Sequence, residues 1–160
     1  LIQTVTVGAG GAASIEFTDI PQDGVSLVVL CSLRVTSSSG ESRIRLNNST
    51  TGYSAILLNG DGSSAGSYST SSTYIQLGDT QYSATANTFA SVQVTIPNYT
   101  SSSAKSTSSE SVSENNGTLA YQNLVAGRWT GTAAIASLQI LGSSNFVQFS
   151  TASLFKIKYD

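Results

Sequence analysis

The stretch NGDG at residues 59–62 carries side-chain oxygens at alternate positions, which is the spacing of a calcium-binding loop. A loop of the EF-hand kind needs several carboxylates and closes with a bidentate glutamate at its twelfth position. Counted from Asn59, that position is Thr70, and Asp61 is the one carboxylate in between. Asn-Gly and Asp-Gly pairs favour tight turns, because such turns need a positive φ. We therefore expect a turn here, then a Ser/Gly-rich linker leading to Tyr68, and no metal site.

Residues for other common chemistries are scarce. The chain has no His, which excludes a Ser-His-Asp arrangement and removes the commonest zinc ligand. Its single cysteine, Cys31, lies in the apolar stretch VSLVVLCSL and is expected to be a small buried hydrophobe. The acidic residues fall in turns, at strand ends and in serine-rich segments, which disfavours the facing carboxylate pair of a glycosidase. We expect no catalytic residue, metal or cofactor, and hence a protein that is not an enzyme.

The composition points to strands and turns with uncharged solvated faces. Ser and Thr make up 48 of the 160 residues, whereas charged residues make up 10%, against roughly 25% in an average soluble domain. The net charge is −2 and the basic residues are scattered, so nucleic-acid binding is not expected. The longest apolar run, residues 25–33, is shorter than the roughly 20 residues that span a membrane, and membrane binding is not expected either.

Alternating apolar and polar residues dominate the chain, which is the period of a β-strand. We predict one domain over residues 1–160 with an all-β fold. Its architecture would be an antiparallel β-sandwich of about eight to ten strands, packed like a jelly roll. The alternation predicts strands at residues 2–7, 13–18, 26–35, 41–46, 52–58, 73–77, 89–97, 118–125 and 134–141, with one or two more within 146–159.

Several of these segments carry finer expectations. The first two strands are expected to pair as a hairpin across the glycine-rich residues 8–11. The nearly continuous apolar segment 26–35 is typical of a central strand covered on both faces. In the fourth strand, Ile44 would face inward and Arg43 and Arg45 outward. The serine-rich segment 101–116 is expected to be a loop or an edge insertion, and residues 127–130 are expected to lead into a loop.

Tyrosines recur in the polar segments, where rigid amphipathic rings suit contact surfaces. Stacking on sugar rings and ordinary rim packing are the alternatives, and Trp129 is expected in the core or as an interface anchor. The candidate interface residues are Tyr53, Tyr68, Tyr74, Tyr82, Arg128 and Trp129.

Three stretches, taken in order, resemble a family of small bacteriophage virion structural proteins, of the jelly-roll capsid decoration (cement) or fibre-tip type. The first is GGAASIEFTDIPQDGVSLVVLCSLR, with a Gly-rich turn, a strand ending in Phe-Thr, an Ile-Pro turn and a long apolar strand. The second is LNGDGSSAGSYS, an Asn-Gly-Asp turn followed by Tyr-Ser. The third is GRWTGTAAIASLQIL, followed by NFVQFSTASLFKIK.

The resemblance implies a virion protein without catalytic residues or cofactor, often trimeric. The main hypothesis is a capsid decoration (cement) protein that binds the outer capsid surface and stabilises the shell. Its partners would be the major capsid protein or other virion proteins, with assembly in the host cytoplasm. The alternative is a receptor-binding or adhesive tip of a head or tail fibre that recognises host surface glycans. A third hypothesis is a secreted β-sandwich that binds carbohydrate, with calcium at Asp61.

Overall fold

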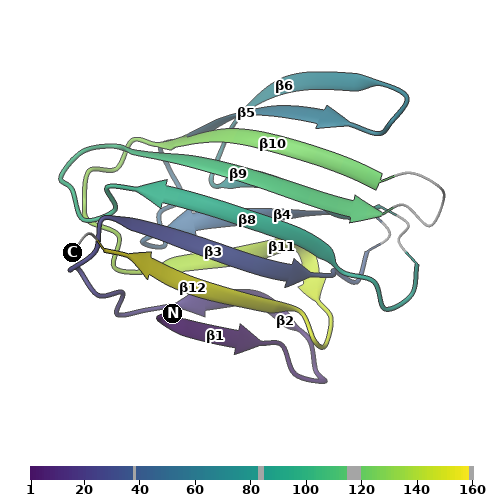
Figure 1. Ribbon diagram of the computed structural model, residues 1–160, viewed down its shortest axis with the longest axis horizontal. Coiled ribbons are helices and arrows are strands. Elements are labelled where there is room, and N and C mark those ends of the chain that lie inside the picture. The colour runs from purple at the N-terminus through teal and green to yellow at the C-terminus, as the bar shows by residue number, and fades with distance from the viewer. Residues whose placement is uncertain (38, 83–84, 115–119, 159–160) are drawn as a thin grey trace.

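The computed structural model describes residues 1–37, 39–82, 85–114 and 120–158, and of residues 39 and 80–82 it describes the backbone only. The described residues form twelve antiparallel β-strands and no helix. Two sheets pack face to face, with the larger sheet in front in Figure 1. The strands are β1 (Gln3–Thr6), β2 (Ala12–Phe17), β3 (Ser26–Leu33), β4 (Ser39–Leu46), β5 (Tyr53–Gly60), β6 (Ala65–Ser72), β7 (Ile75–Tyr82), β8 (Ala90–Pro97), β9 (Lys105–Glu114), β10 (Ala120–Trp129), β11 (Leu138–Phe146) and β12 (Thr151–Ile157).

The strand order is that of a jelly roll with two added hairpins. The large sheet has the order β1-β12-β3-β8-β9-β10-β5-β6, and the small sheet has the order β2-β11-β4-β7. Without β5, β6, β9 and β10, four strands remain in each sheet, and the chain changes sheet at every step except from β4 to β7. This is the eight-stranded double-sheet arrangement of a jelly roll. The β5–β6 and β9–β10 hairpins both extend the large sheet beyond β8.

The core lies between the two sheets and follows from the alternation in the sequence. In β8, Val92, Val94 and Ile96 are all buried, while the residues between them point outward. Successive side chains of a strand point to opposite faces, so one apolar residue in two is enough to fill the core. Burying one such side chain contributes about 1.5–3 kcal/mol. The predicted inward position of Ile44, with Arg43 and Arg45 outside, is confirmed.

Two predictions about the N-terminal strands are wrong. β1 pairs with β12 and β2 pairs with β11, so the first two strands lie in different sheets and form no hairpin. The turn at residues 8–11 carries the chain from one sheet to the other, and Gly11 adopts a φ of 70° there. β3 is an interior strand, but it is covered on one face only, since its burial alternates and Leu30 is 43% exposed.

The serine-rich segment is neither a loop nor an edge strand. β9 pairs with β8 on one side and with β10 on the other, so it is an interior strand of the large sheet. Residues 115 and 116 of the predicted insertion lie outside the described residues. The error arose because small hydroxyl side chains occupy both faces, which leaves no hydrophobic alternation to recognise.

Two further segments exceed their predicted extents. The stretch after Asp61 was expected to be a linker, yet it forms β6, an eight-residue strand paired with β5. The turn predicted at residues 59–62 lies instead at residues 61–64, since Asn59 and Gly60 belong to β5, and the Asp61 backbone N–H donates to the Ser64 carbonyl at 3.2 Å. β10 continues to Trp129, four residues beyond the predicted end of this strand at residue 125. The described strands therefore number twelve rather than eight to ten.

Candidate protein-binding face

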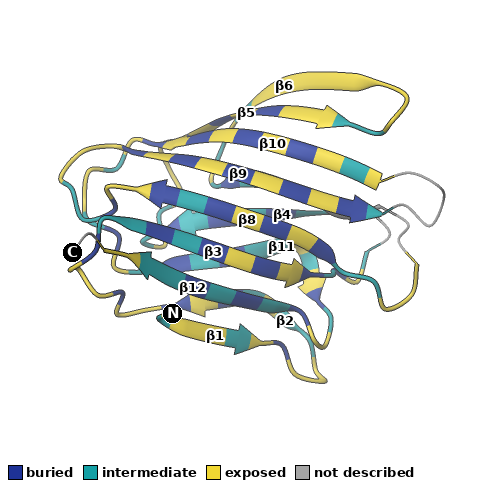
Figure 2. Cartoon of the chain, in the orientation of Figure 1, coloured by how far each residue is buried: buried dark blue, intermediate teal, exposed yellow. Residues whose placement is uncertain are grey.

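The outer face of the large sheet is formed by its side chains that point away from the small sheet. Exposed and buried residues alternate along β9, β10, β5 and β8, so each strand presents every second side chain on this face (Figure 2). The opposite face of the same strands packs on the small sheet. Such a sheet is dry on one side and open to solvent on the other.

Aliphatic side chains gather on this outer face. Of the nine large hydrophobic side chains that are exposed among the described residues, six point outward from the large sheet: Leu30, Ile56, Leu58, Val112, Leu124 and Ile157. Leu58 lies directly opposite Leu124 across the β5–β10 pair, and Ile56 lies opposite Ala126. We call these four residues the aliphatic cluster. Contiguous exposed apolar patches of this kind mark interaction sites.

Small side chains leave shallow hollows beside the aliphatic cluster. The largest, of about 820 Å³, is bordered by Ile56 and Arg128, and its floor is made of small residues such as Ser71, Ser106 and Ala126. Two smaller hollows, of about 140 and 210 Å³, lie on either side of the outward-facing Glu110. The face is therefore uneven on the scale of a side chain, which suits it to receive protruding side chains of a partner.

The outer face carries little charge. Arg128 and Glu110 point outward from β10 and β9, and neither forms an ion pair among the described residues. A third outward charge, Glu114, ends β9 and accepts a hydrogen bond from the Thr88 hydroxyl at 2.7 Å. Otherwise the face presents hydroxyl, amide and aliphatic groups, together with the partly buried ring of Phe155 on β12. A surface of this composition costs less hydration free energy to cover than a charged surface does, because isolated ions are the most expensive groups to bury.

A buried polar seam on the inner side holds the added hairpins against the small sheet. Asn123 of β10 donates from Nδ2 to Asp79 Oδ2 of β7 and to Ser111 Oγ of β9, each at 3.4 Å. Burial raises the pKa of Asp79, and its hydrogen bond from Asn123 acts in the opposite direction. Gly78, with a φ of 113°, allows this close approach, since a Cβ there would lie 2.2 Å from Ser111 Oγ.

Two of the predicted interface residues lie in the core. Tyr53 and Trp129 face each other at the start of β5 and the end of β10, where their rings stack with centroids 6.2 Å apart. They are only 3% and 5% exposed. The Tyr53 hydroxyl donates to the Leu46 carbonyl at 3.1 Å and accepts from the Leu46 N–H at 2.8 Å. These rings join the two sheets. Of the two locations expected for Trp129, the core or an interface, the structure shows the core.

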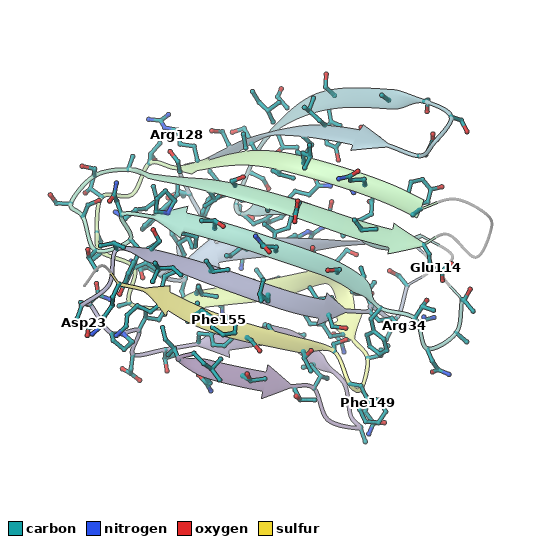
Figure 3. All side chains as sticks on the ribbon, in the orientation of Figure 1. Asp23, Arg34, Glu114, Arg128, Phe149 and Phe155 are labelled. Carbon is teal, nitrogen blue, oxygen red and sulfur yellow. The ribbon has the colours of Figure 1, made fainter. Side chains whose placement is uncertain are left out.

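Of the other predicted residues whose side chains are described, Tyr68 and Tyr74 lie beside β7, whereas Arg128 lies on the outer face of the large sheet. Tyr68 on β6 is 44% exposed and faces β7, where its hydroxyl accepts from Gln76 Nε2 at 3.0 Å. Tyr74 precedes β7, and the Arg43 guanidinium lies over its ring, 4.3 Å from the centroid. The side chain of Tyr82 lies outside the described part of the molecule. Arg128 projects from the outer face (Figure 3).

Sequence reasoning missed the aliphatic cluster, although the sequence holds a signal for it. The run AILL at residues 55–58 breaks the apolar-polar alternation, so in a two-layer sandwich, where a strand is covered on one face only, its other face presents aliphatic residues to solvent or to a partner. The structure shows that Ala55 and Leu57 fill the core while Ile56 and Leu58 point outward. The opposing residue Leu124 could not be assigned without the register of β10.

Reactive groups are few in the described residues. Burial raises the pKa of the Cys31 thiol to about 12, which makes it inert at neutral pH. The Asp61 carboxylate accepts from the backbone N–H groups of Ser63 at 2.8 Å and Ser64 at 2.7 Å, so it stabilises the β5–β6 turn. Within the described residues, no three His, Cys, Asp or Glu side chains are grouped as metal ligands.

Comparison of the chain with protein-family models, with curated proteins and with solved structures gives no match. No helix long and apolar enough to cross a membrane occurs in the described residues.

Proposed function

We propose that this chain is a non-enzymatic structural protein of a bacteriophage virion, a capsid decoration (cement) protein that binds the outside of the shell. The observation that supports this proposal is the outer face of the large sheet, which is open, nearly uncharged and bears most of the exposed aliphatic side chains. The motif resemblance adds the virion context. The partner would be the major capsid protein or another virion protein, met during assembly in the host cytoplasm.

The outer face supplies the binding free energy in this proposal. Ile56, Leu58 and Leu124 are each about half exposed, so covering them adds about 1 kcal/mol apiece. The hollows beside them receive partner side chains, and Arg128 and Glu110 set the register through polar contacts. A ligand that binds the assembled shell more tightly than free capsid subunits stabilises the shell by mass action. No catalytic step is needed for this role.

The open edge of the large sheet favours self-association, and the motif resemblance implies that the assembly is a homotrimer. β6 is eight residues long, carries no charge or proline and is exposed on both faces. A long uncharged edge strand invites pairing with another chain, and closed cyclic assemblies cover such edges. We propose that three copies meet around this edge, and that each copy keeps its outer face free for the shell.

The proposal is tested with phage particles from which the protein has been removed and to which purified protein is added back. We expect the wild-type protein to raise the temperature at which the genome is released. Leu124→Asp should abolish both binding and this shift, because docking would bury an unpaired carboxylate. Ala136→Asp is the control, since it adds the same charge just before β11 on the opposite sheet. Unchanged genome release with bound wild-type protein would refute the cement role, and full activity of Leu124→Asp would refute the proposed face.

A further inference from the structure

A second surface feature lies at the end of the sandwich, away from the outer face. The β3–β4, β7–β8 and β11–β12 connections enclose a hollow of about 610 Å³ there, lined by two phenyl rings and two amides among other groups. Figure 3 shows Arg34 and Phe149 at this end of the molecule. The volume falls in the range of roughly 300–1,000 Å³ that is typical of small-molecule sites. The residues that line it include Arg34, Asn87, Phe89, Gln148 and Phe149.

Phe149 has a backbone conformation that its side chain disfavours. Its φ is 72°, whereas the other described non-glycine residues with positive φ are all Asn or Asp. Asn and Asp tolerate the left-handed region, but for a bulky residue it is a true outlier. The ring is also 65% exposed, so little burial compensates for the strain. Such strain is typical of functional sites, and here it presents an aromatic ring to solvent.

The backbone around Phe149 is firmly held. The Phe149 N–H donates to the Val7 carbonyl at 2.9 Å, and the Ser150 N–H donates to the Val147 carbonyl at 3.2 Å. The Ser150 hydroxyl donates to the Arg34 carbonyl at 3.1 Å. These bonds join the β11–β12 turn to two neighbouring segments, so the ring sits on a preorganised support.

The opposite wall of the hollow is fixed by Arg34. Its Nη1 donates to the carbonyls of Thr85 at 2.6 Å and Thr88 at 2.9 Å, which closes a turn around Asn87. Asn87 has a φ of 66°, so the hollow is lined by two residues in the left-handed region. Glu114 accepts a further bond from the Thr88 hydroxyl. The Arg34 guanidinium and the Glu114 carboxylate therefore hold this turn in place through hydrogen bonds.

The free groups at the hollow match a neutral sugar. Phe89 and Phe149 offer aromatic faces, against which the C–H groups of a pyranose ring pack. The Asn87 and Gln148 side chains make no hydrogen bond within the described residues. Each amide both donates and accepts, as does a sugar hydroxyl. We propose that this hollow binds a neutral saccharide, with the pyranose ring stacked on Phe149 and its hydroxyls bonded to Asn87 and Gln148.

This site is independent of the proposed capsid docking. The hollow is built from connections at one end of the sandwich, whereas the outer face is built from strands β3, β8, β9, β10 and β5. A copy of the protein bound to the capsid can therefore bind a saccharide at the same time. Loss of either activity leaves the other measurable, so a failure of one proposal is distinguishable from a failure of the other.

The test is heteronuclear NMR of the isolated protein titrated with four neutral probes: the methyl glycosides of β-glucose, β-galactose, N-acetyl-β-glucosamine and α-rhamnose. We expect at least one probe to bind with a millimolar dissociation constant and to shift the amide resonances of Asn87, Gln148 and Phe149. Phe149→Gly should weaken that binding at least about tenfold, as expected for a lost stacking contact. It should also raise the melting temperature, since glycine relieves the strain at this φ.

Two variants complete the test. Phe149→Trp keeps an aromatic face and should retain binding within about threefold, since both rings stack. Tyr68→Ala removes an exposed ring outside the hollow and should leave the dissociation constant of the saccharide unchanged. The proposal is overturned if none of the four probes shifts the hollow residues, if Phe149→Gly binds like the wild type, or if the shifts fall elsewhere on the molecule.

Discussion

Gly78 lies where the two sheets approach each other closely. A Cβ at this position would lie 2.2 Å from Ser111 Oγ and 2.8 Å from Asn123 Cβ, and the φ of 113° is disfavoured for any other residue. Both neighbours belong to the added hairpin strands β9 and β10, whereas Gly78 belongs to the small sheet. The glycine therefore lets the extension of the large sheet close on the jelly roll.

Gly78→Ala is expected to destabilise the fold by about 2–4 kcal/mol, the sum of overpacking and left-handed strain. The free energy of unfolding from chemical denaturation measures the effect. Gly10→Ala is the matched control, because a Cβ at Gly10 would meet nothing within 4 Å and its φ is not positive. A Gly78→Ala variant as stable as this control would show that β9 and β10 do not pack on β7 as described.

Individual inward and outward positions were predictable where the alternation is strong. In β4, arginines alternate with aliphatic residues, so the aliphatic side chains can face only the core and the arginines only the solvent. Ile44 is accordingly buried, and Arg43 and Arg45 point outward. Tyr53 and Trp129 were harder to assign, since an aromatic ring with one polar atom suits a core or an interface equally. Their hydrogen bonds and stacking depend on residues far away in the chain, which no local pattern shows.

Strands β6 and β9 show where local patterns fail at the scale of an element. Both are rich in serine. Serine is common in loops and has no strong preference for strands, so it does not indicate a strand. β9 is a strand because β10 pairs with it along its whole length and β8 pairs with residues 108–112 on the other side. Its inner serines are buried by the small sheet, and Thr107, Ser109 and Ser113 make no side-chain hydrogen bond within the described residues. Long-range pairing overrides local composition here.

The connection before β3 is tied to the end of the chain by a charged clasp. The Asp23 carboxylate forms ion pairs with Lys156 of β12 and with Lys158. The hydrogen bond from Lys156, followed by that from Lys158, lowers the pKa of Asp23 from 3.8 to about 2. A carboxyl group with a lowered folded-state pKa stabilises the fold above its unfolded pKa and loses that effect as the pH falls.

Asp23→Asn is accordingly expected to be less stable than the wild type at neutral pH, with the difference shrinking as the pH falls from 3.8 toward about 2. Urea denaturation of both proteins across this pH range measures it. The clasp is exposed, so a salt concentration of about 1 M should screen much of the difference at neutral pH. Parallel stability curves at all pH values would show that the clasp contributes nothing.

At the scale of the whole molecule, the two added hairpins change what a jelly roll presents to its surroundings. They widen one sheet from four strands to eight while the other stays at four. The small sheet covers the inner side of the widened sheet except at β6, and the outer face becomes a broad surface with the aliphatic cluster on the added strands β5 and β10. The all-β sandwich was predictable from alternation, whereas this asymmetry arises from the order in which strands pair.

An electron cryomicroscopy image of the phage particle that carries the protein tests the central claim most directly. We predict density distributed over the capsid in groups of three copies, with the outer face of the large sheet against the shell and the small sheet toward solvent. Copies confined to the tail end, or copies that turn the small sheet toward the shell, would contradict it.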